Sequence, residues 1–385
     1  MRILHTSDWH LGRSFHGMSL HRLTKDLLDE LVQTVVDERI DVVLVAGDVY
    51  DQAQPRTETI GLLSSVLERL ADAGCAVVLS SGNHDSAVRL AFAANLLSKS
   101  GIHLVTDSQS LGTPVTITRG VTTVAIYPIP YLEPRAVAES LGTEPSHEAV
   151  LTEACERIRQ DAAGRDVAAK IVMAHCFATG AEPSASERDI SVGGAISVSQ
   201  QIFAGFDYAA LGHLHGRQRL SETVRYSGSL LAYSFSEEKH RKGGWIIDVG
   251  PDGVSEIREH RWDTKLPLVS LTGTLEELLT DEKYAAHVHD VCRITLTDAQ
   301  RPLGAIDRLR QRFDTVAELN FAPSGDTLRR ERPSLHQLHE KPVTEVCGDF
   351  YQHVRQAELS EEESRFLNRI TTGVKEELNH RDVHA

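Results

Sequence analysis

Short apolar runs alternate with longer amphipathic segments along the first half of the chain. The runs predict strands at residues 3–6, 42–46, 76–80, 171–174 and 208–211. The amphipathic segments predict helices at residues 20–39, 57–71 and 89–98, because their apolar side chains recur three or four positions apart. Residues 42–46 are continuously apolar, which is typical of a strand covered on both faces. Strands that alternate with helices in this way predict a layered α/β sandwich.

The pattern changes after Ser221. Residues 224–226, 244–249 and 255–262 predict antiparallel strands that close the sheet. A compact βαβαβ unit follows, with strands predicted at residues 266–271, 291–297 and 316–320 and helices at residues 275–280 and 303–313. We therefore predict four parts: a main domain at residues 1–264, a small α+β capping domain at 265–321, a polar linker at 322–341 and a helical tail at 342–385.

The tail carries a clear helix-start signal. Ser360 followed by Glu363 matches the capping box, in which each residue hydrogen-bonds the backbone N–H of the other. One face of the expected helix carries Phe366, Leu367, Ile370, Val374 and Leu378. This face can pack on the protein itself or on a partner. We favour a partner, because the linker separates the tail from the main core.

Composition narrows the class of protein. The 385 residues are 41% hydrophobic and 25% charged, which excludes wholesale disorder and suggests two or three domains. The formal charge of −15 argues against broad electrostatic binding of nucleic acid by the free chain, although a partner could supply a basic surface. The five cysteines show no metal-finger or CxxC spacing, so we expect reduced thiols. We expect a cytoplasmic protein without a membrane span.

Five polar motifs follow the apolar runs, and each contains side chains that bind metal ions. They are Asp8-Trp9-His10, Gly47-Asp48-Val49-Tyr50-Asp51, Gly82-Asn83-His84-Asp85, His175 alone, and Gly212-His213-Leu214-His215. Each motif alone is more simply explained as a turn or a structural histidine. Their shared position after predicted strands instead indicates one site, because ligands gather at the carboxyl edge of open α/β sheets.

The spacing of these residues suggests their roles. On extended backbone, Asp8 and His10 would point the same way, and Asp48 is the best candidate to bridge two cations. His84 is expected to contact a phosphoryl oxygen or to protonate the leaving oxygen, and Asp85 to fix the tautomer of His84. The predicted metal ligands are Asp8, His10, Asp48, Asn83, His175, His213 and His215.

This ligand set predicts a pair of divalent cations that neutralise a phosphodiester and activate water. Four histidines with carboxylate and amide oxygens favour Mn²⁺, with Fe²⁺ or Mg²⁺ as alternatives. The residues alone leave three functions open: a DNA nuclease, a phosphoesterase acting on nucleotides or other small molecules, and a non-catalytic scaffold stabilised by metal.

The motifs resemble those of the calcineurin-like metallophosphoesterase superfamily. The opening MRILHTSDWHLGRSFHG, together with GDVYDQAQP, SGNHDS and ALGHLHGRQ, is similar to its SbcD branch, the nuclease subunits of bacterial SbcCD complexes. The resemblance implies a four-layer β-sandwich flanked by helices. It also implies cleavage of DNA as a 3′→5′ double-strand exonuclease, a hairpin-opening enzyme and a single-strand endonuclease, in recombination, replication and repair.

The same resemblance implies site roles and partners. Asp8, His10, Asp48 and His215 would hold one ion, whereas Asp48, Asn83, His175 and His213 would hold the other. His84 would be the catalytic histidine, and the role of Asp51 stays open. The helices at residues 57–71 and 89–98 would form a homodimer contact. The tail would bind the coiled coil of an SbcC-like ATPase, giving a heterotetramer that acts on DNA.

Overall fold

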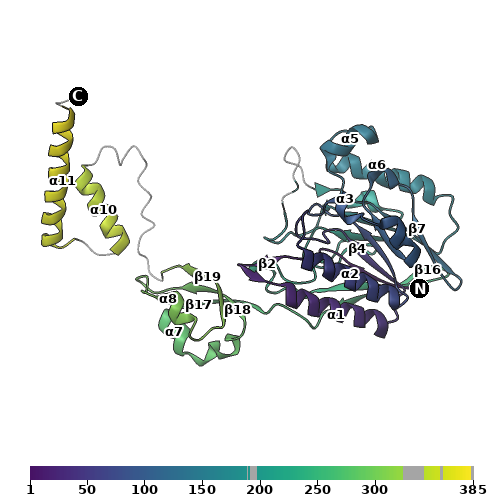
Figure 1. Ribbon diagram of the computed structural model, residues 1–385, viewed down its shortest axis with the longest axis horizontal. Coiled ribbons are helices and arrows are strands. Elements are labelled where there is room, and N and C mark those ends of the chain that lie inside the picture. The colour runs from purple at the N-terminus through teal and green to yellow at the C-terminus, as the bar shows by residue number, and fades with distance from the viewer. Residues whose placement is uncertain (189, 191–196, 324–341, 356–358, 383–385) are drawn as a thin grey trace. The chain divides into compact units, whose positions relative to one another are not determined.

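The computed structural model describes residues 1–188, 190, 197–323, 342–355 and 359–382. The chain divides into two units, Met1–Val269 and Ser270–Ala385. The first unit contains two six-stranded sheets with helices on their outer faces (Figure 1). Its layers are therefore helix, sheet, sheet and helix, which confirms the predicted four-layer α/β sandwich.

The first sheet has a parallel centre. Its order is β16 (Gly253–Arg261), β15 (Gly243–Gly250), β1 (Arg2–Thr6), β4 (Val42–Ala46), β5 (Ala76–Ser80) and β6 (Ile102–Val105). Strands β1, β4, β5 and β6 are parallel, and β15 and β16 extend the sheet antiparallel. The carboxyl ends of the parallel strands consequently share one edge.

The second sheet is built in the same way. Its order is β13 (Gln218–Arg219), β14 (Val224–Tyr226), β12 (Tyr208–Gly212), β9 (Ala169–His175), β8 (Thr122–Pro128) and β7 (Val115–Arg119). The prediction that residues 224–226 form an antiparallel closing strand is wrong, because β14 pairs parallel with β12. Only the short β13 pairs antiparallel with β14.

The core between the sheets comes from the inward face of each strand. Val42, Leu44, Ile126, Ile171 and Met173 are fully buried there. The outer helices are α1 (His21–Asp37), α2 (Thr57–Asp72), α5 (Pro134–Leu141) and α6 (His147–Ala162). A second cluster packs the apolar face of α6 against the second sheet. Burial of both faces explains the continuously apolar strands.

The helix predicted at residues 89–98 is wrong as a single element. Two short helices form instead, α3 (Ala87–Leu90) and α4 (Ala94–Leu97). Ala93 between them has φ 61°, a left-handed conformation that ends a right-handed helix. Two short ribbons, β2 (Ser14–Phe15) with β3 (Met18–Ser19) and β10 (Phe177–Ala178) with β11 (Ser197–Val198), complete this unit.

The second unit begins with a three-stranded sheet in the order β17–β18–β19. Its elements are β17 (Leu268–Gly273), α7 (Leu275–Thr280), β18 (Val291–Leu296), α8 (Ala305–Leu309) and β19 (Thr315–Phe321). The βαβαβ order follows the prediction, although α8 is shorter than residues 303–313. Leu278, Ile294, Leu309 and Phe313 are fully buried in it.

Two helices form the tail, α10 (Val343–Arg355) and α11 (Glu361–Asp382). The predicted capping box is confirmed, because the Ser360 amide donates to the Glu363 carboxylate at 2.9 Å and the Glu363 amide to the Ser360 hydroxyl at 3.2 Å. Val374 and Leu378 of the predicted apolar face lie outside the described side chains. Most of the predicted linker, residues 324–341, also lies outside the described residues. None of the described helices is long and apolar enough to cross a membrane.

Candidate metal centre

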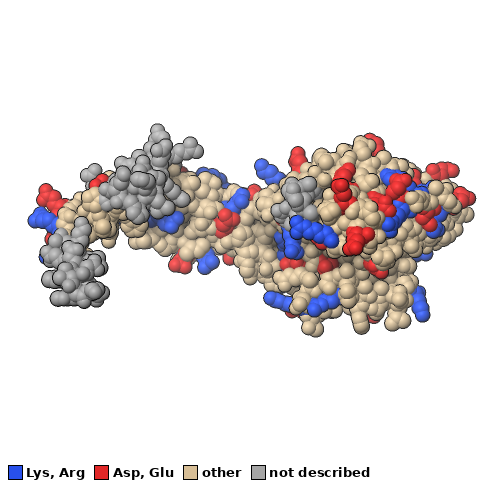
Figure 2. Space-filling view, turned by 90° about the horizontal axis from the view of Figure 1, so that it is seen from above, with Lys and Arg blue, Asp and Glu red and all other residues tan. Residues whose placement is uncertain are grey.

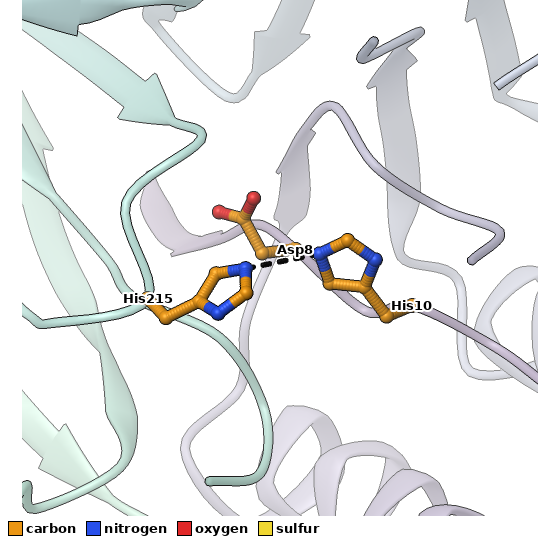
Figure 3. A group of neighbouring side chains, drawn as sticks. All are labelled: Asp8, His10 and His215. Carbon is orange, nitrogen blue, oxygen red and sulfur yellow. Dashed lines mark hydrogen bonds between the residues drawn. The ribbon is translucent and has the colours of Figure 1, made fainter. Parts of the chain in front are cut away.

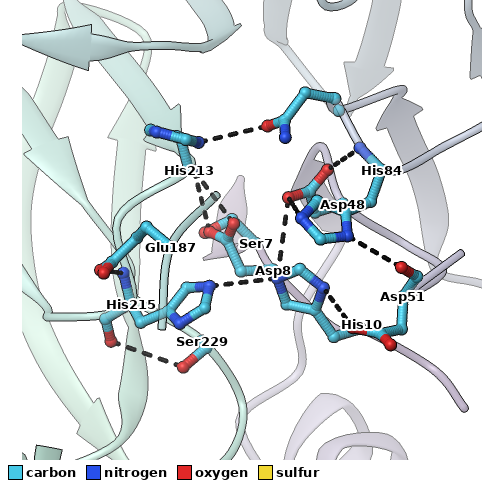
Figure 4. A network of polar contacts seen from close by, with 12 residues as sticks. Ser7, Asp8, His10, Asp48, Asp51, His84, Glu187, His213, His215 and Ser229 are labelled. Carbon is cyan, nitrogen blue, oxygen red and sulfur yellow. Dashed lines mark hydrogen bonds and ion pairs between the residues drawn. The ribbon is translucent and has the colours of Figure 1, made fainter. Parts of the chain in front are cut away.

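The predicted ligands gather where strands of both sheets end. Asp8 and His10 follow β1, Asp48 follows β4, and Asn83 follows β5 on the first sheet. On the second sheet, His175 ends β9, and His213 and His215 follow β12. The structure brings all seven side chains and His84 together in one cluster. Figure 4 labels five of the ligands, together with His84.

One group of candidate ligands consists of Asp8, His10 and His215 (Figure 3). The Nε2 atoms of His10 and His215 lie 3.1 Å apart. Burial raises the pKa of Asp8 to about 6 and lowers the pKa of His10 to about 3. A neutral His10 can direct the lone pair of Nε2 towards His215 only if its proton is on Nδ1. The Nδ1 atom lies 3.4 Å from the Asp51 carboxylate. The group thus offers two imidazole nitrogens and a carboxylate oxygen to a cation.

A second group consists of Asp48, His175 and His213. The Nε2 of His175 lies 3.3 Å from Asp48 Oδ2 and 2.9 Å from Asn83 Oδ1, and His213 Nδ1 lies 3.2 Å from the same Asn83 oxygen. On the far side of its ring, His175 Nδ1 donates to the Ala46 carbonyl at 2.9 Å. Burial alone would lower the pKa of His175, but the carboxylates of Asp48 and Asp8 and the Ala46 carbonyl together raise it to about 9.

Asp48 lies between the two groups. Its Oδ2 is 3.6 Å from His10 Nε2 on one side and 3.3 Å from His175 Nε2 on the other. Its Oδ1 accepts the backbone N–H of His84 at 2.9 Å, which fixes the carboxylate plane. A carboxylate in this position can contribute one ligand atom to each of two neighbouring cations.

The backbone of the ligand loops differs from the prediction. Asp8 and His10 were expected on extended backbone, but their φ values are 51° and 43°. Asp48 and His213 also have positive φ, at 49° and 101°. Non-glycine residues rarely adopt this region, and such conformations concentrate at functional sites. The ligand carboxylates and imidazoles therefore converge through tight turns rather than through strand alternation.

Asp85 does not have the role that its position beside His84 suggested. Its carboxylate accepts the backbone N–H groups of Val49, Tyr50 and Gly82 at 2.9–3.1 Å. The Nδ1 of His84 instead lies 2.8 Å from the Asp51 carbonyl oxygen. The prediction that Asp85 fixes the tautomer of His84 is wrong, because three amides already occupy that carboxylate. Asp85 instead ties the loop after β4 to the loop after β5.

His84 points its free ring nitrogen towards the cluster. Its Nε2 lies 4.0 Å from Asp48 Oδ2 (Figure 4). The carbonyl of Asp51 accepts a hydrogen bond from Nδ1–H, so Nε2 is the nitrogen that can exchange a proton with a substrate. His84 is half-buried, as is Asn83, whereas the other six candidate ligands are buried. It occupies a position from which it can reach a molecule bound at the rim.

Several supporting residues were not predicted. The Ser7 hydroxyl donates to Asp8, the His213 amide donates to both oxygens of Asp8 at 3.0 and 3.1 Å, and Glu187 accepts the His215 amide at 2.8 Å (Figure 4). The Tyr233 ring contacts the rings of His10 and His215 edge-on. Glu187 and Tyr233 belong to no ligand-spaced motif, so the sequence offered no signal for either of them.

The donor set fits two divalent cations that share Asp48. Four imidazoles, two carboxylates and an amide oxygen lie within reach of one another, and all but Asn83 are buried. Closely packed carboxylates need compensating positive charge, which bound cations would supply. The cysteines that the structure describes are outside both groups, which favours a metal that prefers nitrogen and oxygen.

Family models agree with this geometry. Residues 1–217, more than half of the chain, match the calcineurin-like phosphoesterase model, so the chain belongs to that family. Residues 265–355 match a second model, described as the type 5 capsule protein repressor C-terminal domain. The two matches together support an SbcD-like nuclease subunit, as the sequence predicts.

Two solved structures are similar to part of this chain. TT1561 of Thermus thermophilus is 16% identical over 68% of this chain and 98% of its own, with a TM-score of 0.41. A dimetal phosphatase from Danio rerio (LOC 393393) is 12% identical over 68% of this chain and 99% of its own, with a TM-score of 0.36.

Proposed function

We propose that this protein is a metal-dependent DNA nuclease that works with an SbcC-like coiled-coil ATPase in DNA end processing. The proposed activities are 3′→5′ exonuclease action on double strands, hairpin opening and single-strand endonuclease action. The observation that carries the proposal is the pair of ligand groups joined through Asp48, with His84 beside them. The C-terminal match favours the nuclease branch over enzymes for small substrates.

The ligands divide naturally between two ions. We assign Asp8, His10, Asp48 and His215 to one ion, and Asp48, Asn83, His175 and His213 to the other, with Mn²⁺ as the favoured metal. When bound, such a pair supplies positive charge to the phosphodiester and activates a water molecule. Asp48 belongs to both sets because its Oδ2 lies near a histidine of each.

The residues of the chain have separate tasks in this reaction. The Asp51 carbonyl holds Nδ1 of His84, which leaves Nε2 to hydrogen-bond a phosphoryl oxygen or to give a proton to the leaving oxygen. Asp85 keeps the loops that carry Asp48 and His84 in register through its three amide contacts. In both cases the contribution of the residue is to fix the position of a loop or a ring through hydrogen bonds to the backbone.

The surface charge bears on how DNA is held. Figure 2 shows Lys and Arg interspersed with Asp and Glu on one face of the molecule. The formal charge of the chain is −15, so DNA affinity from counterion release alone is expected to be weak. We propose that the ATPase partner supplies much of the DNA affinity, as the tail and the second family match suggest.

The decisive test combines one variant with two DNA substrates. His84→Ala should lower Mn²⁺-dependent cleavage of linear and hairpin DNA by roughly 10²–10⁴-fold, since general acid–base groups contribute that much. Metal content, measured by isothermal titration calorimetry, should stay at two ions. His103→Ala, a half-buried histidine of β6 away from the cluster, is the matched control and should cleave like the wild type.

Cleavage that survives in His84→Ala, or in the wild type after EDTA treatment, contradicts the proposal. Assays with bis-p-nitrophenyl phosphate and cyclic nucleotides identify the alternative. If these are hydrolysed and DNA is not, the same metal centre serves a small-molecule phosphoesterase.

A further inference from the structure

A buried ion pair between Lys242 and Glu237 contacts His215. The Lys242 ammonium contacts Glu237 Oε2, the Ser229 hydroxyl at 2.9 Å and the His215 carbonyl at 2.7 Å. An ammonium has three hydrogens, so these three acceptors satisfy it completely. The side chains of Glu237 and Lys242 are 0% and 7% exposed. Burying such a pair is costly, which makes a purely stabilising role a poor explanation.

The second oxygen of Glu237 reaches His215 through a hydroxyl. Its Oε1 accepts from Ser186 Oγ, and that Oγ lies 2.5 Å from His215 Nδ1. The direct distance from Glu237 Oε1 to His215 Nδ1 is 3.6 Å, which is too long for a hydrogen bond. The Ser186 hydroxyl therefore bridges the carboxylate and the imidazole.

The hydrogen bonds from Glu237 through Ser186 to His215 can hold their protons in only one arrangement. The neighbouring Ser184 hydroxyl lies 3.3 Å from the same Glu237 oxygen but 2.7 Å from Glu187, to which it donates. An ionised carboxylate only accepts hydrogen bonds, so the proton that Glu237 receives along this path is that of Ser186. The same hydroxyl oxygen can then only accept from His215, which places the imidazole proton on Nδ1. His215 Nε2 is left with a lone pair, and it faces His10 and Asp8 (Figure 3).

We propose that Glu237 is a positioning residue that acts through Ser186 to hold His215 in its metal-binding tautomer. Lys242 supports it by pairing with the carboxylate and by fixing the His215 backbone carbonyl. This role rests on the proposed function, in which His215 is a metal ligand. It adds to that function a carboxylate, a hydroxyl and an ammonium from outside the ligand motifs. Such partners orient ligating histidines and tune their affinity for metal.

Glu237→Gln tests the proton arrangement directly. Lys242 needs an acceptor, so the amide oxygen should turn to Lys242 and the amide nitrogen to Ser186. Ser186 would then donate to His215 Nδ1, and the imidazole proton would move to Nε2. We expect one Mn²⁺ to bind about 10–100-fold more weakly by calorimetry. In metal-free protein labelled with ¹⁵N-histidine, the His215 signal should change from a protonated Nδ1 to a protonated Nε2.

Two further variants keep the test independent of folding. Ser186→Ala removes one hydroxyl from a partly exposed residue and should also weaken one Mn²⁺ site. Glu259→Gln makes the same chemical change at a surface pair with Arg217 and should bind both ions like the wild type. Melting temperatures in EDTA show whether each variant is folded before metal is added.

His215→Ala separates this inference from the proposed function. If His215→Ala loses one ion while Glu237→Gln and Ser186→Ala bind both ions with wild-type affinity and a protonated Nδ1, the positioning role is wrong and the metal centre stands. If His215→Ala keeps both ions, the ligand assignment and the positioning role are both wrong. Weakened binding and a changed tautomer in Glu237→Gln support the inference.

Discussion

Gly82 illustrates how closely the ligand loops approach one another. A Cβ at this position would lie 2.1 Å from Asp48 Oδ1 and 2.3 Å from the Asp48 amide nitrogen. The φ of Gly82 is not positive, so close packing rather than backbone freedom demands glycine here. Gly47 is needed for both reasons, with φ 84° and a Cβ position 2.3 Å from His175 Nδ1. The Gly–Asp and Gly–Asn spacing of the motifs thus has a steric cause.

Gly82→Ala should therefore displace the bridging carboxylate. We expect the free energy of unfolding to fall by about 1–3 kcal/mol, as for other overpacked sites. We also expect fewer than two Mn²⁺ ions by calorimetry, since Asp48 belongs to both ligand groups. Gly61→Ala, where a Cβ meets nothing within 4 Å on the exposed side of α2, is the control. It should keep both ions and gain roughly 0.5–1 kcal/mol of stability. Two ions in Gly82→Ala would contradict the steric argument.

Residue types could be predicted from the sequence, but their partners could not. The candidate ligands were found because each follows an apolar strand, and parallel strands end at a common edge. The proton partners of these ligands come from distant segments, such as Ser186 and Glu237 for His215. Asp85 was misjudged for the same reason. Its neighbour in sequence is His84, but its partners in space are backbone amides of two loops.

Helices α3 and α4 and the turn between them expose several large apolar side chains within one short stretch of the chain. Val88 and Phe92 are 86% and 83% exposed, and Leu96 and Ile60 of α2 are also exposed. A monomer gains nothing by exposing large apolar side chains together, so such patches mark interaction sites. We propose that this surface forms the homodimer contact that the family resemblance implies.

Phe92→Asp should disrupt that contact. Burying a Phe side chain contributes about 1.5–3 kcal/mol, and two copies of the residue are affected in a symmetric dimer. We expect the molar mass from light scattering to change from dimer to monomer at micromolar concentration, with an unchanged melting temperature. Val121→Asp is the control, because Val121 is equally exposed at 87% but lies in the turn between β7 and β8. A dimer that persists in Phe92→Asp would place the contact elsewhere.

Elements with strong periodicity were predictable, and those with mixed signals were not. The strands that precede the ligand motifs appeared near their actual bounds because both of their faces are buried. Strand β8 and helix α6 were not recognised, although α6 buries Val150, Leu151, Ala154 and Ile158 on one face. The break at Ala93 has no sequence signal, since alanine normally favours helix and adopts its left-handed conformation here only in the tertiary context.

At the scale of the whole molecule, the candidate metal centre and the candidate partner-binding tail belong to different units. The first contains the candidate metal centre, and the second carries the tail after the small sheet of β17–β19. Exposed apolar side chains occur on both tail helices, with Phe350 and Val354 on α10 and Phe366 and Ile370 on α11. An amphipathic helix pair with uncovered apolar residues fits a partner that presents an apolar helical surface. This surface supports the proposal that the tail binds the coiled coil of an SbcC-like ATPase.

Phe366→Asp in the full chain tests that assignment. Loss of one buried aromatic side chain should weaken association with the ATPase roughly tenfold or more, since its burial contributes about 1.5–3 kcal/mol. Hydrolysis of bis-p-nitrophenyl phosphate by the free chain should be unchanged, because every proposed ligand lies in the first unit. Leu303→Asp is the control, as Leu303 is fully exposed in the second unit outside the tail. Equal affinity of Phe366→Asp and wild type, measured by calorimetry with the purified ATPase, would exclude this face of α11 as the contact. If phosphodiester hydrolysis fell as well, the tail would instead contribute to the metal centre.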